Sequence, residues 1–239
     1  MTSPPEAVYG RRPVREVLRA GRREALELLA SERALRAEPW LRDETGIRLQ
    51  VRTDSALTAE AGTRDHQGVV ALCEPYPYSD AYEIAAGEWP LVVCLDQVTD
   101  PRNLGAVVRS AEGAGASGVV VPEHHAARVT AAVCRASAGA VEHVPVAVVV
   151  NLARYLGEVK RDDVWVWAAA SNAWTAVWDA DLTGGTVLVF GSEGRGVRPG
   201  VRRACDDALA IPLAGEVESL NVSVSAGIAL FEAARQRRG

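Results

Sequence analysis

The sequence predicts an α/β protein with a small N-terminal domain and a larger C-terminal domain built on a parallel sheet. Three observations lead to this prediction. Short apolar runs alternate with helical stretches along the chain. The runs after residue 90 are continuously apolar, which is typical of strands covered on both faces. A stretch rich in Pro, Tyr and small residues separates two differently patterned parts.

The first part, residues 1–75, is expected to be the small α/β unit. A basic helix is predicted near residues 12–22, followed by the apolar run ALELLA, a charged helical stretch, the strand IRLQV, a short helix and the strand GVVALCE. Residues 76–90 are expected to form a linker. From residue 91 to residue 239, six apolar strands alternate with helices: LVVCL, GVVV, VPVAVV, VWVWAAA, TVLVF and ALAIPL. This pattern favours a doubly wound parallel sheet, in which ligands bind at the carboxyl ends of the strands.

Composition excludes several classes of protein. No run approaches the roughly 20 apolar residues of a membrane span, and the N-terminus lacks the apolar core of a signal peptide, so we expect a cytoplasmic protein. The His124-His125 pair lacks metal-ligand spacing, and no structural metal is expected. The widely spaced cysteines are expected to be buried small hydrophobes: Cys73, Cys94, Cys134 and Cys205.

Charge is unevenly distributed along the chain. A net charge of -5 argues against a protein that coats nucleic acid indiscriminately. The segment YGRRPVREVLRAGRR is nevertheless dominated by arginine, and the chain ends in RQRRG. These basic segments either bind a polyanion selectively or are solvated helix faces.

Three turns after apolar strands carry the candidate functional residues. In LDQVTDPRNLGAVVRS, Asp100 and Pro101 make the turn, Asn103 is expected to cap a helix, and Arg109 lies about one and a half helical turns further on. Taken alone, this stretch favours a capped helix with a surface arginine over a functional site.

The second turn, TVLVFGSEGRGV, runs from a strand into three glycines. Clustered glycines let backbone amides approach a ligand closely. Their spacing is neither the GxGxxG of dinucleotide folds nor a P-loop. The carboxylate of Glu193 would repel a phosphate, so a neutral or cationic ligand fits better.

The third turn lies in IPLAGEVESLNVSVSAGIALFE. Here Ser219 or Asn221 is expected to cap the last helix, whose apolar stripe continues to Phe231. Capping alone does not explain why Ser223 and Ser225 follow inside the helix.

Taken together, DPRNLGAVVRSAE, LVFGSEGRGV and IPLAGEVESLNVSVSAGIALFEAARQR resemble, in order and spacing, motifs 1, 2 and 3 of the SpoU (TrmH) family of RNA ribose 2'-O-methyltransferases, within the SPOUT superfamily. The resemblance spans residues 91–239 and is greatest to the branch that methylates a guanosine of 23S ribosomal RNA. In the N-terminal part, VYGRRPVREVL and HQGVVA are similar to the start and end of the family's substrate-binding domain, which has an L30e-like fold.

The resemblance implies a C-terminal domain threaded into a deep trefoil knot, S-adenosylmethionine as cofactor, and a homodimer with the active site near the interface. The positions that match the family's cofactor pocket are Ala169, Gly191, Ile211, Leu213 and Leu220. The positions that match its catalytic motifs are Asn103, Arg109, Glu193, Ser219 and Asn221. Arg11, Arg12 and Arg15 are expected to contact RNA phosphates.

The resemblance also suggests roles. Arg109 takes the place of the motif 1 arginine; because a guanidinium is a poor base, we expect it to fix a phosphate and stabilise a developing alkoxide. Asn103 would orient this arginine or the ribose. Glu193 would either hold the arginine or take the hydroxyl proton.

Three alternatives remain at this level. A non-catalytic RNA-binding relative is disfavoured because Asn103, Arg109, Glu193 and Asn221 are all present. A nucleotide-dependent oxidoreductase would need a GxGxxG after the first strand of the sheet, which LDQVTDPRNLG lacks. A transfer-RNA target competes with ribosomal RNA, which the N-terminal domain favours only by analogy.

Overall fold

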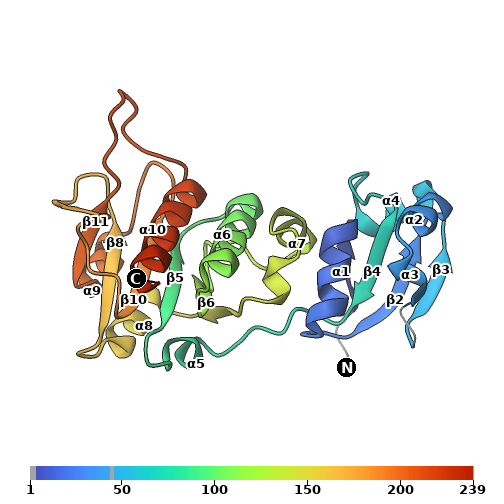
Figure 1. The fold of residues 1–239 in the computed structure, drawn as a ribbon, viewed down its shortest axis with the longest axis horizontal. Helices are drawn as coiled ribbons and strands as arrows, with labels where there is room; N and C mark the ends of the chain where they lie inside the picture. Colours follow the sequence, from blue (N-terminus) through green and yellow to red (C-terminus); the bar gives the residue numbers. More distant parts are fainter. Residues whose placement is uncertain (1–3, 44–45, 239) are drawn as a thin grey trace. The chain divides into compact units, whose positions relative to one another are not determined.

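The computed structural model describes residues 4–43 and 46–238. It divides into two compact units, one comprising residues 1–77 and 128–143 and the other residues 78–127 and 144–239. The α/β prediction is confirmed in both (Figure 1). No helix in the described part of the chain is long and apolar enough to cross a membrane.

Unit 1 contains a four-stranded sheet in the order β1-β4-β2-β3. Its central strand β4 pairs antiparallel with β1 and β2, and β3 pairs parallel with β2. The strands are β1 (Glu6–Tyr9), β2 (Ala25–Ala30), β3 (Arg48–Val51) and β4 (Val69–Cys73). The helices are α1 (Arg11–Ala20), α2 (Glu32–Ala37), α3 (Trp40–Asp43), α4 (Asp54–Ala61), α7 (Ala131–Ala136) and the 3-10 turn η1 (Ala140–Glu142).

Residues 128–143 pack on α1 of unit 1, although the sequence pattern groups them with the C-terminal part. A Cβ on Gly139 would lie 2.6 Å from the Cβ of Glu16, so the absence of a side chain permits this close approach. Arg23 and Glu142, both buried, form an ion pair at 2.5 Å. Strand β1 was not predicted from the sequence because it is a four-residue edge strand without a distinct apolar alternation.

Unit 2 contains a parallel sheet of seven strands in the order β7-β6-β5-β10-β8-β11-β9. The strands are β5 (Leu91–Asp96), β6 (Gly118–Pro122), β7 (Val146–Val149), β8 (Val164–Ala169), β9 (Thr175–Ala176), β10 (Gly185–Gly191) and β11 (Asp207–Ala210). The helices are α5 (Ala81–Ala85), α6 (Pro101–Ala114), α8 (Leu152–Val159), α9 (Pro199–Ala204) and α10 (Val222–Arg237).

Both faces of this sheet are covered. Val92 and Cys94 of β5 belong to a buried cluster with α5, α8 and α9, while α6 and α10 pack against each other and contact β6 and β10 respectively. This coverage explains why the strands of unit 2 are so apolar in the sequence. All six residues of β5, for example, are buried. Residues 78–90, expected as a linker, belong to unit 2, where Asp80 caps α5.

Candidate functional site

The candidate site lies where three segments meet beyond the carboxyl ends of parallel strands. These segments are the start of α6, the 191–198 loop after β10, and the 211–221 segment that leads from β11 to α10 (Figure 1). Because the side chains they bring together are far apart in the sequence, only the parallel sheet makes them neighbours.

Helix α6 begins earlier than the sequence suggested. Its N-cap is Asp100, whose carboxylate accepts a hydrogen bond from the backbone N–H of Arg102 at 2.8 Å, and Pro101 occupies the first turn. The expectation that Asn103 caps this helix was therefore wrong. Since Asp100 satisfies the helix end, the amide of Asn103 is available for a contact outside the helix.

That contact is with Glu193, in a cluster that joins all three segments. The Nδ2 atoms of Asn103 and Asn221 donate to Glu193 Oε1 at 3.2 and 2.5 Å. Asn221 Nδ2 also donates to Asn103 Oδ1 at 3.1 Å. Within the described chain, this carboxylate has amide donors and no Lys or Arg partner.

Asn221 is also the N-cap of α10. The sequence left Ser219 and Asn221 open as candidates for this cap, and the structure has Asn221. Its Oδ1 accepts hydrogen bonds from the backbone N–H of Ser223 at 2.9 Å and from the Ser223 hydroxyl at 2.6 Å. The cap fixes the orientation of the Asn221 amide, so that Oδ1 faces the helix and Nδ2 faces Glu193. This geometry explains why a serine follows the cap inside the helix.

The glycines after β10 are required by the loop's own conformation. A Cβ on Gly191 would lie only 1.9 Å from the carbonyl carbon of Gly196. Gly196 donates its N–H to the carbonyl of Ser192 at 2.8 Å, and Gly194 and Gly196 have φ values of 78° and 65°. The loop therefore turns back tightly on itself and presents Glu193.

A cavity of about 340 Å³ opens beside this loop. It is within the size range of small-molecule sites, and all five residues expected to bind a cofactor line it: Ala169, Gly191, Ile211, Leu213 and Leu220. Glu193 and Glu218 line it as well, whereas none of the described lining residues is Lys or Arg. An apolar wall with carboxylates and no cation suits a ligand that carries positive charge.

Ser219 and Arg109, the remaining residues expected to be catalytic, lie in different surroundings. Ser219 is exposed and lines the cavity. Arg109 is exposed on α6, and its side chain has no hydrogen bond or ion pair with residues of the described ranges. It lies six residues after Asn103, which at 3.6 residues per turn puts the two side chains on different faces of the helix. Gly113, one turn beyond Arg109, faces Phe231 of α10.

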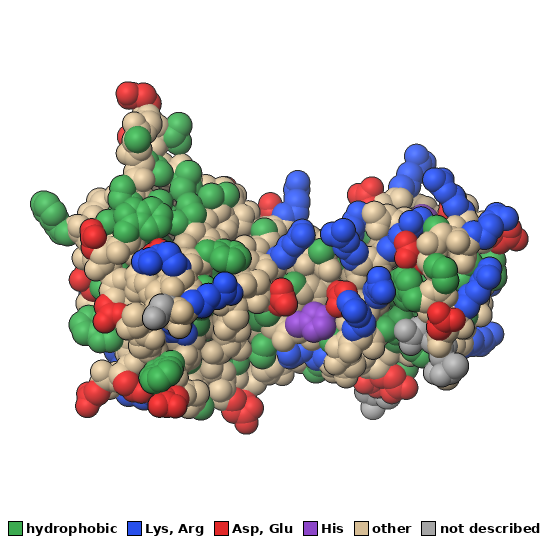
Figure 2. All heavy atoms as spheres, in the orientation of Figure 1, with side chains coloured by type: hydrophobic (Ala, Val, Ile, Leu, Met, Phe, Trp, Pro, Cys, Tyr) green, Lys and Arg blue, Asp and Glu red, His purple; other side chains and the backbone are tan. Residues whose placement is uncertain are grey.

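The three N-terminal arginines lie on α1 in unit 1. Arg11 forms an ion pair with Glu38 at 3.2 Å, the guanidinium of Arg15 lies 5.9 Å from the centre of the Trp40 ring, and Arg12 is exposed. On the face drawn in Figure 2, Lys and Arg side chains are spread widely over unit 1.

Two residues that position the loop were missed at the sequence level. Asp96 ends β5 with a fully buried side chain and accepts hydrogen bonds from the backbone N–H and the Nε of Arg198, both at 2.8 Å. The sequence did contain a sign of this role, because Asp96 directly follows five apolar residues of a buried strand. A carboxylate at such a position is costly to bury without a partner.

No group of three or more His, Cys, Asp or Glu that could hold a metal occurs in residues 4–43 and 46–238. The four cysteines are buried and free.

Comparison with known proteins identifies the family. Residues 90–231 match the SpoU rRNA Methylase family, and residues 7–79 match the RNA 2'-O ribose methyltransferase substrate binding family. The chain belongs to the SpoU rRNA methylase family. The resemblance seen in the sequence motifs is thereby confirmed, and the SpoU match covers the whole candidate site.

Among SpoU relatives, the chain is 45% identical over 207 residues to the 23S rRNA (guanosine-2'-O-)-methyltransferase RlmB of Burkholderia sp, covering 85% of this chain and 83% of that protein. It is 39% identical to RlmB of Vibrio vulnificus over 97% of both chains. The solved SpoU methyltransferase AviRb from Streptomyces viridochromogenes, in complex with AdoMet, superimposes with a TM-score of 0.84 at 28% identity, covering 97% of this chain and 90% of that one.

Proposed function

We propose that this protein transfers a methyl group from S-adenosylmethionine to the ribose 2'-hydroxyl of a guanosine in 23S ribosomal RNA. The observation that carries the proposal is the Glu193 cluster beside a cavity that has carboxylates but no cation among its described lining residues. The RlmB relatives, which are named for this reaction, match nearly the whole chain.

The cavity residues fit the cofactor chemically. S-adenosylmethionine supplies a methyl group bonded to a positively charged sulfur, which a hydroxyl oxygen can attack directly. Ala169, Gly191, Ile211, Leu213 and Leu220 would hold it through apolar surface and backbone groups. Glu193 and Glu218 give the cavity the negative charge that favours a sulfonium ion.

Glu193 is the group we propose to accept the hydroxyl proton. Both amide hydrogen bonds end on Oε1, which leaves Oε2 as the oxygen that takes the proton. The amides of Asn103 and Asn221 fix the rotamer of this carboxylate, and such positioning lowers the entropic part of the barrier. The alternative role for Glu193, holding Arg109, is not favoured because the two side chains form no ion pair in the described chain.

We propose that two copies of the chain form a homodimer, in which Arg109 acts near the interface. Val224, Ile228 and Phe231 follow one face of α10, and the first and last of these are 49% and 52% exposed. Exposed Leu213, Val217 and Leu220 lie in the preceding segment, and hydrophobic side chains gather in this part of unit 2 in Figure 2. A contiguous apolar patch is typical of a protein interface. Since Phe231 contacts the helix turn that follows Arg109, this arginine borders the patch.

In this proposal Arg109 binds a phosphate of the RNA and stabilises the developing alkoxide, while Arg11, Arg12 and Arg15 contact phosphates elsewhere on the RNA. Residues 1–75 bind the substrate and residues 91–239 carry out methyl transfer. The C-terminal trefoil knot and a cytoplasmic location are parts of the same proposal. They are supported by membership in the SpoU family.

The deciding experiment is methyl transfer from radiolabelled S-adenosylmethionine to 23S and transfer RNA from a strain that lacks this gene. Label in 23S RNA, lost in Glu193→Gln and Arg109→Ala but kept in Arg154→Ala, is the expected result. Arg154 is a matched control because it is exposed on α8, does not line the cavity, and pairs with Glu158.

Label in transfer RNA alone would replace the ribosomal target with a transfer-RNA one. No label in either RNA, with cofactor binding intact by calorimetry, would instead make the chain a non-catalytic RNA-binding relative.

A further inference from the structure

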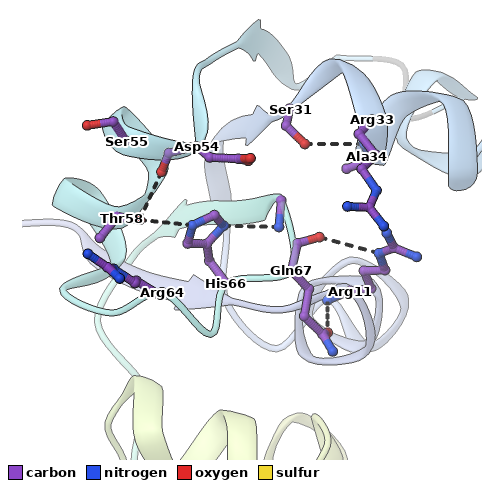
Figure 3. Close-up of a pocket in the computed structure, with 11 residues that line it drawn as sticks. Arg11, Ser31, Arg33, Ala34, Asp54, Ser55, Thr58, Arg64, His66 and Gln67 are labelled. Atoms are coloured by element: carbon purple, nitrogen blue, oxygen red, sulfur yellow. Dashed lines mark hydrogen bonds between the residues drawn. The ribbon is translucent and has the colours of Figure 1, made fainter.

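Unit 1 contains a second cavity, of about 660 Å³, that the proposed chemistry does not use. It lies between α2, α4 and the turn that precedes β4 (Figure 3). The residues that line it are Arg11, Ser31, Arg33, Ala34, Asp54, Ser55, Thr58, Arg64, His66, Gln67 and Gly68. The cavity belongs entirely to unit 1.

Its charge is predominantly positive. Three lining residues are arginines, and Asp54 is the only acidic one among those described. Arg33 and Arg64 are exposed and have no ion pair with any residue in the described ranges. Arg11 and Arg33 lie on one side of the cavity and Arg64 on the other (Figure 3). Two guanidinium groups that line the cavity without an ion pair in the described ranges favour an anionic ligand.

Arg11 is held in place by the residues around it. Its Nε donates to the carbonyl of Gln67 at 3.4 Å, and its guanidinium pairs with Glu38 at 3.2 Å. The backbone N–H of Arg11 donates to Gln67 Oε1 at 3.2 Å. This arginine is therefore oriented before any ligand arrives.

The floor of the cavity is polar and uncharged. His66 Nδ1 accepts the backbone N–H of Gly68 at 3.0 Å, which leaves the ring proton on Nε2. That nitrogen lies 3.1 Å from Thr58 Oγ1, and the Thr58 hydroxyl donates to the carbonyl of Asp54 at 2.9 Å. The chain of hydrogen bonds fixes the tautomer of a 5% exposed imidazole.

We propose that this cavity receives an unpaired nucleotide of the RNA substrate, with its phosphates against Arg11, Arg33 and Arg64 and its base and sugar over the polar floor. The proposal rests on the proposed function, because RNA is taken to be the substrate. A base enters a cavity only when it is turned out of a helix, and proteins read RNA sequence mainly at such unpaired positions. The internal hydrogen bonds of the floor use Gln67 Oε1 and both ring nitrogens of His66, and they leave the Gln67 Nε2 donor and the second lone pair of Thr58 Oγ1 for the edge of a base.

The test measures binding by the full-length protein, without cofactor, of a fluorescent RNA hairpin that has an unpaired loop and of the blunt duplex made from its stem. We expect the hairpin to bind more tightly than the duplex. Arg33→Gln and Arg64→Gln should each weaken hairpin binding about fivefold or more. Each should lower the slope of log affinity against log salt by about 0.7.

Two further variants separate the cavity from general attraction to RNA. Arg36→Gln is the matched control, because Arg36 is exposed on the same helix α2, pairs with Glu32 and does not line the cavity; it should bind as the wild type does. Asp54→Asn removes the one acidic group among the described lining residues and should strengthen hairpin binding. Thermal unfolding of each variant checks that the fold is kept.

Equal losses in Arg33→Gln and Arg36→Gln, equal binding of hairpin and duplex, or no binding of either RNA by the wild type would overturn the proposal. Failure of the proposed function looks different. If the wild type transfers no methyl group to any RNA but the cavity variants still lose hairpin binding, the cavity assignment stands and the enzymatic one falls.

Discussion

Asp96 and Arg198 join the end of β5 to the end of the glycine-rich loop. The Asp96 carboxylate, which is fully buried, accepts the backbone N–H of Arg198 at 2.8 Å and forms an ion pair with its guanidinium at 2.7 Å. Asp96 is also the register partner of Gly191. The pair therefore closes the loop that carries Glu193 at both ends, with β10 holding one end and Arg198 the other.

Replacing Asp96 by Asn should loosen this loop. The amide places a donor against the donors of Arg198, so we expect a loss of about 2 kcal/mol in the free energy of unfolding, less than for a fully buried pair because Arg198 is half exposed. The dissociation constant for S-adenosylmethionine should rise about tenfold, which corresponds to about 1.4 kcal/mol.

Asp163→Asn provides the control for this substitution, because Asp163 pairs with Arg161 at the surface and such pairs contribute about 0–1 kcal/mol. Denaturant unfolding and calorimetry measure both quantities. Equal effects of the two substitutions would show that Asp96 does not support the loop.

Replacing Glu193 by Gln should separate chemistry from cofactor binding. The carbonyl oxygen of the substituted side chain still accepts the amide of Asn103 or Asn221, but the neutral amide cannot take a proton, so we expect kcat to fall about 100-fold or more. The dissociation constant for the cofactor should rise by only about threefold, or about 0.7 kcal/mol, because Glu218 keeps one carboxylate in the cavity. Glu112→Gln, on the exposed surface of α6, should leave both unchanged. A kcat for Glu193→Gln close to that of the wild type would remove Glu193 as the proton acceptor.

Replacing Gly191 by Ala should disrupt the loop sterically. The new methyl group would lie 1.9 Å from the Gly196 backbone, which cannot rotate away as a side chain can. We expect the cofactor affinity to fall at least about tenfold, or about 1.4 kcal/mol. Gly157→Ala on α8 is the contrasting variant: nothing lies within 4 Å of its new methyl group, so it should stabilise the protein by up to about 1 kcal/mol. Calorimetry and thermal unfolding distinguish the two; unchanged cofactor affinity in Gly191→Ala would mean that the loop tolerates a different shape.

The four cysteines should be unreactive toward thiol reagents in the folded protein. Burial raises the pKa of Cys73 to about 12 and those of Cys134 and Cys205 to about 11, from an ordinary value of 9.0, and it also raises the pKa of the fully buried Cys94. Because the thiolate is the reactive form, a thiol reagent at about pH 8 should label none of the four until the chain is denatured, when all four react. Rapid labelling of any one thiol in the native protein would contradict this burial.

The same shifts give a pH dependence with a definite sign. A thiol whose pKa is raised in the folded state ionises first in the unfolded state, so its contribution to stability is complete below about pH 9 and is lost as the pH rises through the raised values. The free energy of unfolding should therefore fall above about pH 9. Substituting a single buried Cys by Ala should reduce the steepness of this fall.

Much of the fold and the chemistry is encoded locally. Continuously apolar runs indicated the six main strands of unit 2, since a strand covered on both faces needs no polar side chain. The resemblance to the SpoU family indicated the residues that line the cavity beside the glycine-rich loop, while caps and glycines marked the turns that carry Glu193 and Asn221. These signals work because they depend on a residue's own backbone conformation or on its immediate neighbours.

Only the tertiary structure determined which residues from distant segments of the chain contact one another. Asn103 is not a cap but a partner of Glu193, because Asp100 already satisfies the helix end. Residues 128–143 pack on α1, and Asp96 finds its partner 102 positions away in Arg198. Each of these contacts depends on the order in which strands and helices are assembled. Hydrophobic periodicity along the chain specifies which residues are buried, but it does not specify which of the buried and polar groups become neighbours.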